Sequence, residues 1–175
     1  MLDIALEADG EWDSSGSATK DWAGLARRAA TSAIAESAFP QLGSGSRTVE
    51  LGVRLTSDDQ VRALNAHWRG KDTATNVLSF PLAEPYELDD DAWGDEGTGP
   101  ELMLGDIVLA HGVCAAEAAD KAISVEHHAS HLLVHGTLHL LGYDHSDAAA
   151  AADMEAREVR ALARLGIADP YAVTC

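Results

Sequence analysis

Three histidines of this chain are spaced so that they could bind one metal ion. His135 and His139 are four residues apart, so in a helix both rings leave the same face. Gly142 suits a left-handed helix end, after which the chain can turn back and bring His145 towards the other two. Three imidazoles that leave one coordination position open are typical of a catalytic zinc site, because structural sites are usually closed by four protein ligands. The spacing therefore predicts one Zn²⁺ per chain, held by His135, His139 and His145.

The same run is similar to the long signature of zinc metalloproteases, H-E-x-x-H-x-x-G-x-x-H. All three His and the Gly match, but Gly136 stands where the proteases have the Glu that acts as their general base. We therefore expect a chain that binds metal without being an ordinary peptidase. The alternative is three core or surface histidines at chance spacing. The position of Gly142 and the apolar residues around the ligands argue against it.

A helix must position the first two ligands, and the sequence predicts one over about residues 124–141, with a serine as candidate N-cap. Histidines recur at every fourth residue along one face of this helix. We expect His127 and His128 to be exposed. His131 lies one turn before His135, and it is either a residue that supports the site from behind the ligands or a core histidine with a satisfied ring.

Alternating apolar and polar residues predict strands, and apolar residues at helical spacing predict further helices. The strands are expected at about residues 2–7, 49–55, 76–80 and 102–110, and the helices at about 21–39, 57–68, 113–122 and 147–165. This order predicts one α/β (α+β) domain over residues 1–175, a small mixed sheet of about four strands with a central, zincin-like metal helix. Residues 10–18 are expected to form a loop. Residues 83–101 are expected to form an acidic loop insertion, either a solvated excursion or a flap over the site.

Residues 135–145 read H-G-T-L-H-L-L-G-Y-D-H, and this run resembles the signature of the YbeY family of metal-dependent endoribonucleases. Three further stretches resemble the family in the same order: Leu64-Asn65 followed by Arg69, T-N-V-L-S-F-P at 75–81, and L-G-D-I at 104–107. The resemblance covers about residues 47–170. It implies a single-strand-specific endoribonuclease that acts in 16S rRNA 3′-end maturation and ribosome quality control. RNA, the small ribosomal subunit and its assembly factors are the partners that it implies.

Arg69 and Lys71 form a short turn with two positive charges. A guanidinium fork suits the nonbridging oxygens of a phosphate, so Arg69 is our candidate catalytic residue, and both side chains are candidates for binding RNA. The alternative for Arg69 is a solvated surface residue, and the family resemblance favours the functional interpretation. We expect the site in a cleft between the metal helix and the segment that contains Arg69 and Ser79. Asp106, between apolar neighbours in a predicted strand, is expected to be structural.

The net charge of −17 argues against binding nucleic acid. A bound metal ion and the basic residues expected to border the cleft (Arg54, Arg62, Arg69 and Lys71) would make the local field more positive. Two alternatives therefore stay open: a metal-stabilised ribosome-assembly factor without strong nuclease activity, and a metal hydrolase of a non-RNA substrate. The chain has no apolar run long enough for a membrane helix, no secretory signal and two isolated cysteines, so we expect a cytoplasmic protein.

Overall fold

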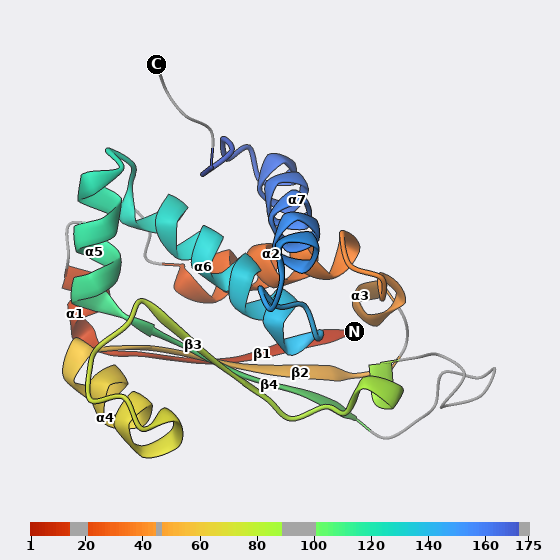
Figure 1. Cartoon of the computed structure of the whole chain (residues 1–175), viewed down its shortest axis with the longest axis horizontal. Coiled ribbons are helices and arrows are strands. Elements are labelled where there is room, and N and C mark those ends of the chain that lie inside the picture. Colours follow the sequence, from red (N-terminus) through yellow and green to blue (C-terminus); the bar gives the residue numbers. More distant parts are fainter. Residues whose placement is uncertain (15–20, 45–46, 89–100, 172–175) are drawn as a thin grey trace.

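One four-stranded sheet organises the molecule (Figure 1). The computed structural model describes residues 1–14, 21–44, 47–88 and 101–171. The strands lie in the order β1-β2-β4-β3, in which β1, β2 and β4 run parallel and β3 pairs antiparallel with β4 at one edge. Their bounds are Leu2–Ala8 for β1, Val49–Thr56 for β2, Val77–Pro81 for β3 and Leu102–Ala110 for β4. The predicted α/β class and small mixed sheet of four strands are confirmed.

Helices cover the two faces of this sheet unequally (Figure 1). Helices α2, α6 and α7 lie on one face, and α4 lies on the other. The helices are α1 (Gly10–Ser14), α2 (Trp22–Ala35), α3 (Gln41–Ser44), α4 (Asp58–Arg69), α5 (His111–Asp120), α6 (Val125–Leu140) and α7 (Ala148–Arg164), with a 3₁₀ turn, η1, at Pro85–Leu88. Among the described residues, no helix combines the length and the apolar character that crossing a membrane requires.

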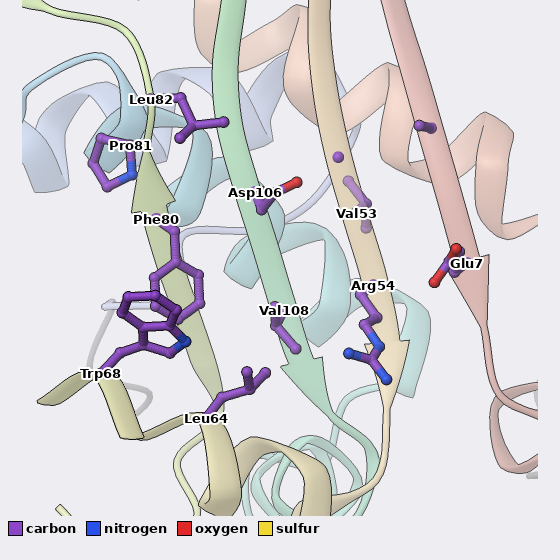
Figure 2. A pocket seen from close by; sticks show the side chains of 12 residues that line it. Glu7, Val53, Arg54, Leu64, Trp68, Phe80, Pro81, Leu82, Asp106 and Val108 are labelled. Atoms are coloured by element: carbon purple, nitrogen blue, oxygen red, sulfur yellow. The ribbon is translucent and has the colours of Figure 1, made fainter. Parts of the chain in front are cut away.

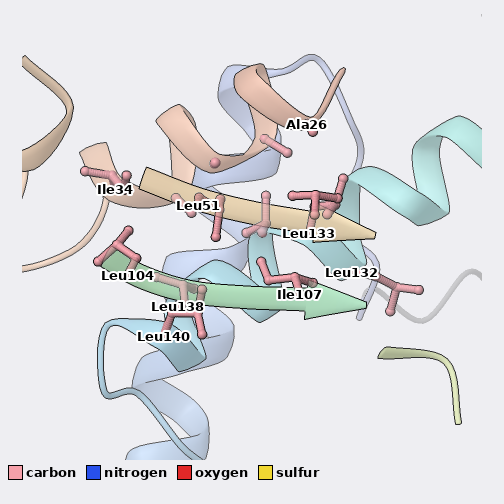
Figure 3. Close-up of a cluster of buried hydrophobic side chains, with 14 of the residues drawn as sticks. Ala26, Ile34, Leu51, Leu104, Ile107, Leu132, Leu133, Leu138 and Leu140 are labelled. Carbon is pink, nitrogen blue, oxygen red and sulfur yellow. The ribbon is translucent and has the colours of Figure 1, made fainter. Parts of the chain in front are cut away.

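The main core lies between the sheet and helices α2 and α6 (Figure 3). Leu51 of β2 and Leu104 and Ile107 of β4 point into it and meet Leu133 and Leu138 of α6. Leu104 and Ile107 are three residues apart, and both reach this core because the register between β2 and β4 shifts beside Gly105, which has a φ of 143°. Helix α6 is buried over most of its length, because the sheet, α2, α5 and α7 all contact it. The metal helix is therefore the central helix of the fold, as predicted.

Several element boundaries differ from the predicted ones. Residues 10–14 form α1 instead of a loop, and Trp12 of this helix is fully buried, with its Nε1 donating to the Thr56 carbonyl at 3.1 Å. Helix α2 ends at Ala35 instead of continuing to Phe39. Helix α5 begins two residues before the predicted start at Val113. Most of the acidic loop, residues 89–100, lies outside the described residues.

Candidate metal centre

The structure brings the three predicted ligands together at the end of α6. One ring nitrogen of each of His135, His139 and His145 lies within 4.8 Å of those of the other two. The Nε2 atoms of His135 and His139 are 3.0 Å apart, and the rings of His135 and His145 stack with their centroids 4.9 Å apart. Three nitrogen donors that converge in this way could hold a single metal ion.

The turn after α6 carries His145 back to the other ligands. Gly142 has a φ of 99°, a conformation that favours glycine. Its N–H donates to the His139 carbonyl at 3.0 Å, and the N–H of Tyr143 donates to the Leu138 carbonyl at 3.1 Å. These two bonds form a Schellman motif, the helix ending for which the glycine was predicted. The Tyr143 hydroxyl anchors the turn further by accepting from the Ala38 N–H at 2.9 Å.

His139 is suited to metal binding at neutral pH. Its burial, together with the nearby rings of His135 and His145, lowers its pKa to about 4. The imidazole is therefore neutral at pH 7, and one of its ring nitrogens has a lone pair to donate to a metal. The donor set fits a borderline metal such as zinc, since imidazole nitrogen is one of its preferred ligands.

Glu158 of α7 is a site residue that the sequence analysis missed. Its side chain is completely buried, and its Oε1 is hydrogen-bonded to Nδ1 of His135. Burial alone would raise the pKa of this carboxyl, but hydrogen bonds from His131, His135 and Tyr171 lower it to about 2. The group is thus a carboxylate that only accepts, so Nδ1 of His135 carries the hydrogen. The lone pair of His135 is then on Nε2, the atom that faces His139.

Two more side chains contact the carboxylate of Glu158. The hydroxyl of Tyr171 donates to its Oε2, and both burial and this bond raise the pKa of Tyr171, so the phenol stays protonated. Nε2 of His131 lies 3.4 Å from the same oxygen and 3.3 Å from the Tyr171 hydroxyl. His131 is buried and lies behind the ligands, in contact with the carboxylate.

The sequence does contain a signal for Glu158. The apolar face of α7 is formed by Met154, Ala161 and Leu162, all buried. Glu158 lies on that face, four residues after Met154 and four before Leu162. A lone carboxylate on the buried face of an amphipathic helix needs hydrogen-bond donors, which points to a polar site beneath the helix.

His128 is buried, and the prediction that it is exposed was wrong. Helix α5 packs against this end of α6 and brings Glu117 to 2.9 Å from Nε2 of His128. The same carboxylate accepts from Nδ2 of Asn76 at 2.9 Å, just before β3 begins. Burial lowers the pKa of His128 against the opposing effect of Glu117. This cluster joins α5, α6 and the start of β3. His127 is exposed, as expected.

Arg69 and Lys71 lie on the surface at the end of α4. The helix ends at Gly70, which has a φ of 68°, and both basic side chains beside it are exposed. No hydrogen bond or ion pair between described residues joins them to the three histidines. Ser79 of β3 does lie against α6, because a methyl group at Gly136 would be 3.1 Å from its Oγ.

Arg54 and Asp106 lie away from the histidines, on the face of the sheet that α4 partly covers (Figure 2). They line a pocket of about 720 Å³ together with Trp68 of α4 and Phe80 of β3. Arg54 therefore does not border the histidines, contrary to our expectation. Asp106 is exposed at the wall of this pocket.

Comparison with known proteins places the whole arrangement in one family. Over 172 residues the chain is 48% identical to the endoribonuclease YbeY of Sphingopyxis alaskensis, covering 98% of each chain. It is 53% identical over 154 residues to that of Novosphingobium aromaticivorans, covering 87% of this chain and 88% of the relative. A solution structure of a Thermotoga maritima protein, 22% identical, shares the fold with a TM-score of 0.51 over 99% of this chain and 100% of its own. The family model described as endoribonuclease YbeY matches residues 14–166, and the chain belongs to that family.

Proposed function

We propose that this protein is a zinc-dependent endoribonuclease that cleaves single-stranded RNA. The observation that carries the proposal is the convergence of three histidine nitrogens within 4.8 Å, with His139 kept neutral by burial. The relatives that cover nearly the whole chain are named endoribonucleases, which supports RNA as the substrate. A bound zinc ion would supply Lewis-acid polarisation of a phosphoryl oxygen and a lower pKa for water.

The side chains of this chain would hold the metal ion and bind the phosphates of the RNA. His135, His139 and His145 would hold the ion, with the lone pair of His135 directed by Glu158. Arg69 would bind a nonbridging phosphate oxygen through its planar fork, and Lys71 would bind a neighbouring phosphate as a point charge. Both are exposed at the surface, where a flexible strand can reach them.

The biological role that we propose is maturation of the 16S rRNA 3′ end and ribosome quality control in the cytoplasm. The partners would be rRNA, the small ribosomal subunit and its assembly factors. Family membership supports this role. Association through basic ribosomal proteins would also suit a chain with a net charge of −17.

The test combines metal content with cleavage of a defined single-stranded RNA. We expect one zinc per chain in the unchanged protein, and loss of both zinc and cleavage in His139→Ala and in His145→Ala. His145 is exposed, so its replacement leaves the core intact. His127→Ala is the matched control, an exposed histidine on the same helix, and it should keep both properties. Full zinc content in the two ligand variants would contradict the site.

The same experiment separates two other functions. A metal-stabilised assembly factor, which the net charge of −17 favours, would bind zinc and small subunits without cutting RNA. A metal hydrolase of another substrate would cleave peptides or esters in a zinc-dependent way. The second is disfavoured because Gly136 takes the place of the peptidase base and lies packed against the sheet. Casein cleavage that is lost in His139→Ala would establish it instead.

A further inference from the structure

Glu158 is a buried charge whose partners in the structure are two histidines and a tyrosine. Its carboxylate is completely buried, and its contacts are with His131, His135 and the Tyr171 hydroxyl. Within the described residues it forms no ion pair with a Lys or Arg. A carboxylate buried in this way is costly unless a positive charge compensates it nearby. A metal ion bound on the far side of His135 would provide that charge.

The contact with His135 also determines which ring nitrogen of this histidine carries the hydrogen. Oε1 of Glu158 bonds to Nδ1 of the ring, while Nε2, on the opposite side of the same ring, faces His139. Since a carboxylate only accepts, this contact places the hydrogen on Nδ1 and leaves the lone pair on Nε2. The opposite tautomer would point an N–H bond at the position of the metal and would prevent coordination.

We propose that Glu158 is a positioning residue of the metal centre, which fixes the tautomer and the ring orientation of His135, and that Tyr171 holds the Glu158 carboxylate in place. The inference rests on the metal site of the proposed function. Carboxylates that accept from the distal nitrogen of a metal-bound histidine raise the affinity for the metal, and their loss typically weakens it by about 10- to 100-fold.

Tyr171 extends the centre to the segment that follows α7. Its backbone N–H donates to Oδ1 of Asp169 at 2.8 Å, which turns the chain so that the phenol reaches Glu158. The hydroxyl supplies a hydrogen bond to Oε2, the oxygen that His135 does not use. Without it, Oε2 would keep only the longer contact to His131, at 3.4 Å, among its contacts in the described part of the chain. The segment after the last helix thereby contributes to metal affinity without touching the metal.

The first test measures zinc affinity by competition with a chelator of known affinity. We expect Glu158→Gln, which keeps the shape and removes the charge, to bind zinc about 10- to 100-fold more weakly. Tyr171→Phe should show a smaller loss in the same direction. The matched controls are Glu155→Gln, an exposed glutamate one turn earlier on α7, and Tyr86→Phe, an exposed tyrosine. Both controls should bind zinc as the unchanged protein does.

A second measurement distinguishes positioning from a merely structural role. In the metal-free protein, ¹⁵N chemical shifts of the His135 ring should show Nδ1 protonated, and Glu158→Gln should shift the ring towards a mixture of tautomers. The thermal midpoint of metal-free Glu158→Gln should stay within a few degrees of that of the unchanged chain. If this variant does not fold, Glu158→Asp replaces it, because it keeps the charge but shortens the reach to His135. It should bind zinc more weakly with its fold intact.

The outcomes separate the inference from the function on which it rests. Normal zinc affinity and an unchanged His135 tautomer in Glu158→Gln, with zinc bound by the unchanged protein, would overturn the inference alone. A lower thermal midpoint with unchanged zinc affinity would also overturn it, since the residue would then be only structural. Absence of zinc binding by the unchanged protein would overturn the metal site and this inference together.

Discussion

Gly136 lies where α6 packs tightly against the sheet. A methyl group at this position would be 3.0 Å from Cγ2 of Ile107 and 3.1 Å from Oγ of Ser79, closer than ordinary van der Waals contact. Two strands, β4 and β3, therefore fill the space into which a side chain would extend. The missing peptidase base is thus explained by packing, because a glutamate here would have to push the ligand-bearing helix away from the sheet.

Gly136→Ala should destabilise the protein even though alanine is the better helix former. The helix-propensity gain is up to about 1 kcal/mol, whereas overpacking a buried contact costs about 1–3 kcal/mol. We expect a net loss of about 1 kcal/mol in the free energy of unfolding, measured with denaturant on the metal-free protein. Gly10→Ala is the control, since no atom lies within 4 Å of its added methyl group. An increase in stability in Gly136→Ala would refute the close packing.

Single residues differed in how well the sequence predicted them. The convergence of His135, His139 and His145 depends on one helix and one turn, so local spacing was enough to predict it. The role of Glu158 depends on how α7 packs against α6, and neighbouring residues in the sequence do not encode that contact. The burial of His128 likewise depends on the docking of α5.

At the scale of elements, the end of α4 presents the two basic residues proposed to bind RNA. Ser57 caps the start of the helix by accepting from the Gln60 N–H at 3.3 Å, and Gly70 ends it in a left-handed conformation. After this helix end, the carboxylate of Asp72 accepts two hydrogen bonds from the guanidinium of Arg62, at 2.8 and 3.1 Å. This exposed pair spans the turn. Among the described residues, the neighbouring Arg69 forms no ion pair.

Arg69→Ala should therefore reduce RNA cleavage much more than it reduces stability. The side chain is exposed and contributes nothing to the core, so the thermal midpoint should change by less than about 2 °C, as for ordinary surface substitutions. Loss of a charge-assisted phosphate contact should lower kcat/KM by about 10- to 100-fold, or about 1.5–3 kcal/mol. Arg69→Lys should recover only part of the activity, because it replaces a fork by a point charge.

The exposed Arg62 offers a matched control for that experiment. Its guanidinium is paired with Asp72, so Arg62→Ala removes a charge of the same kind from the same helix without removing the proposed phosphate contact. Cleavage should fall much less than in Arg69→Ala. Equal activities of the two variants would show that Arg69 acts only through general charge.

Elements were predictable where periodicity was strong. The predicted bounds were wrong where a local side-chain hydrogen bond ends a helix or where one buried residue holds a short helix in place. β4 was predicted with its observed bounds because it is a mostly apolar run, although its burial does not alternate strictly and its register with β2 shifts once. α2 ends early because the Ser37 hydroxyl bonds back to the Ile34 carbonyl at 2.7 Å and its own oxygen then accepts from the Phe39 N–H. α1 was missed because a short polar segment shows no helical period, and the burial of its Trp12 depends on the rest of the fold.

For the molecule as a whole, strand number was predictable but strand order was not. The order β1-β2-β4-β3 places β4 between two strands that both precede it in the sequence, a pairing set by long-range contacts. That order makes β3 one of the two edge strands, and its Ser79 lies directly beside α6. The candidate centre thus lies near an edge of the sheet, where a substrate strand can approach without crossing the core.

The whole-molecule charge leads to the last prediction, a shallow dependence of RNA cleavage on salt. With a net charge of −17, the protein has few basic groups to displace counterions from RNA. If Arg69 and Lys71 are the main phosphate contacts, two contacts give a slope of about −1.4 in log affinity against log salt for a single strand. A fivefold rise in potassium chloride should then lower kcat/KM for a short single-stranded RNA by roughly tenfold.

Removing one of the two contacts should flatten that slope by about 0.7, so Arg69→Ala provides the internal control. A basic nuclease surface with six or more phosphate contacts would instead lose about a thousandfold over the same salt range. Such a steep loss would mean that the RNA follows a basic surface outside the α4 turn, and Arg69→Ala would then leave most of the slope in place. A shallow slope that flattens in the variant would assign RNA binding to two side chains at the end of one helix.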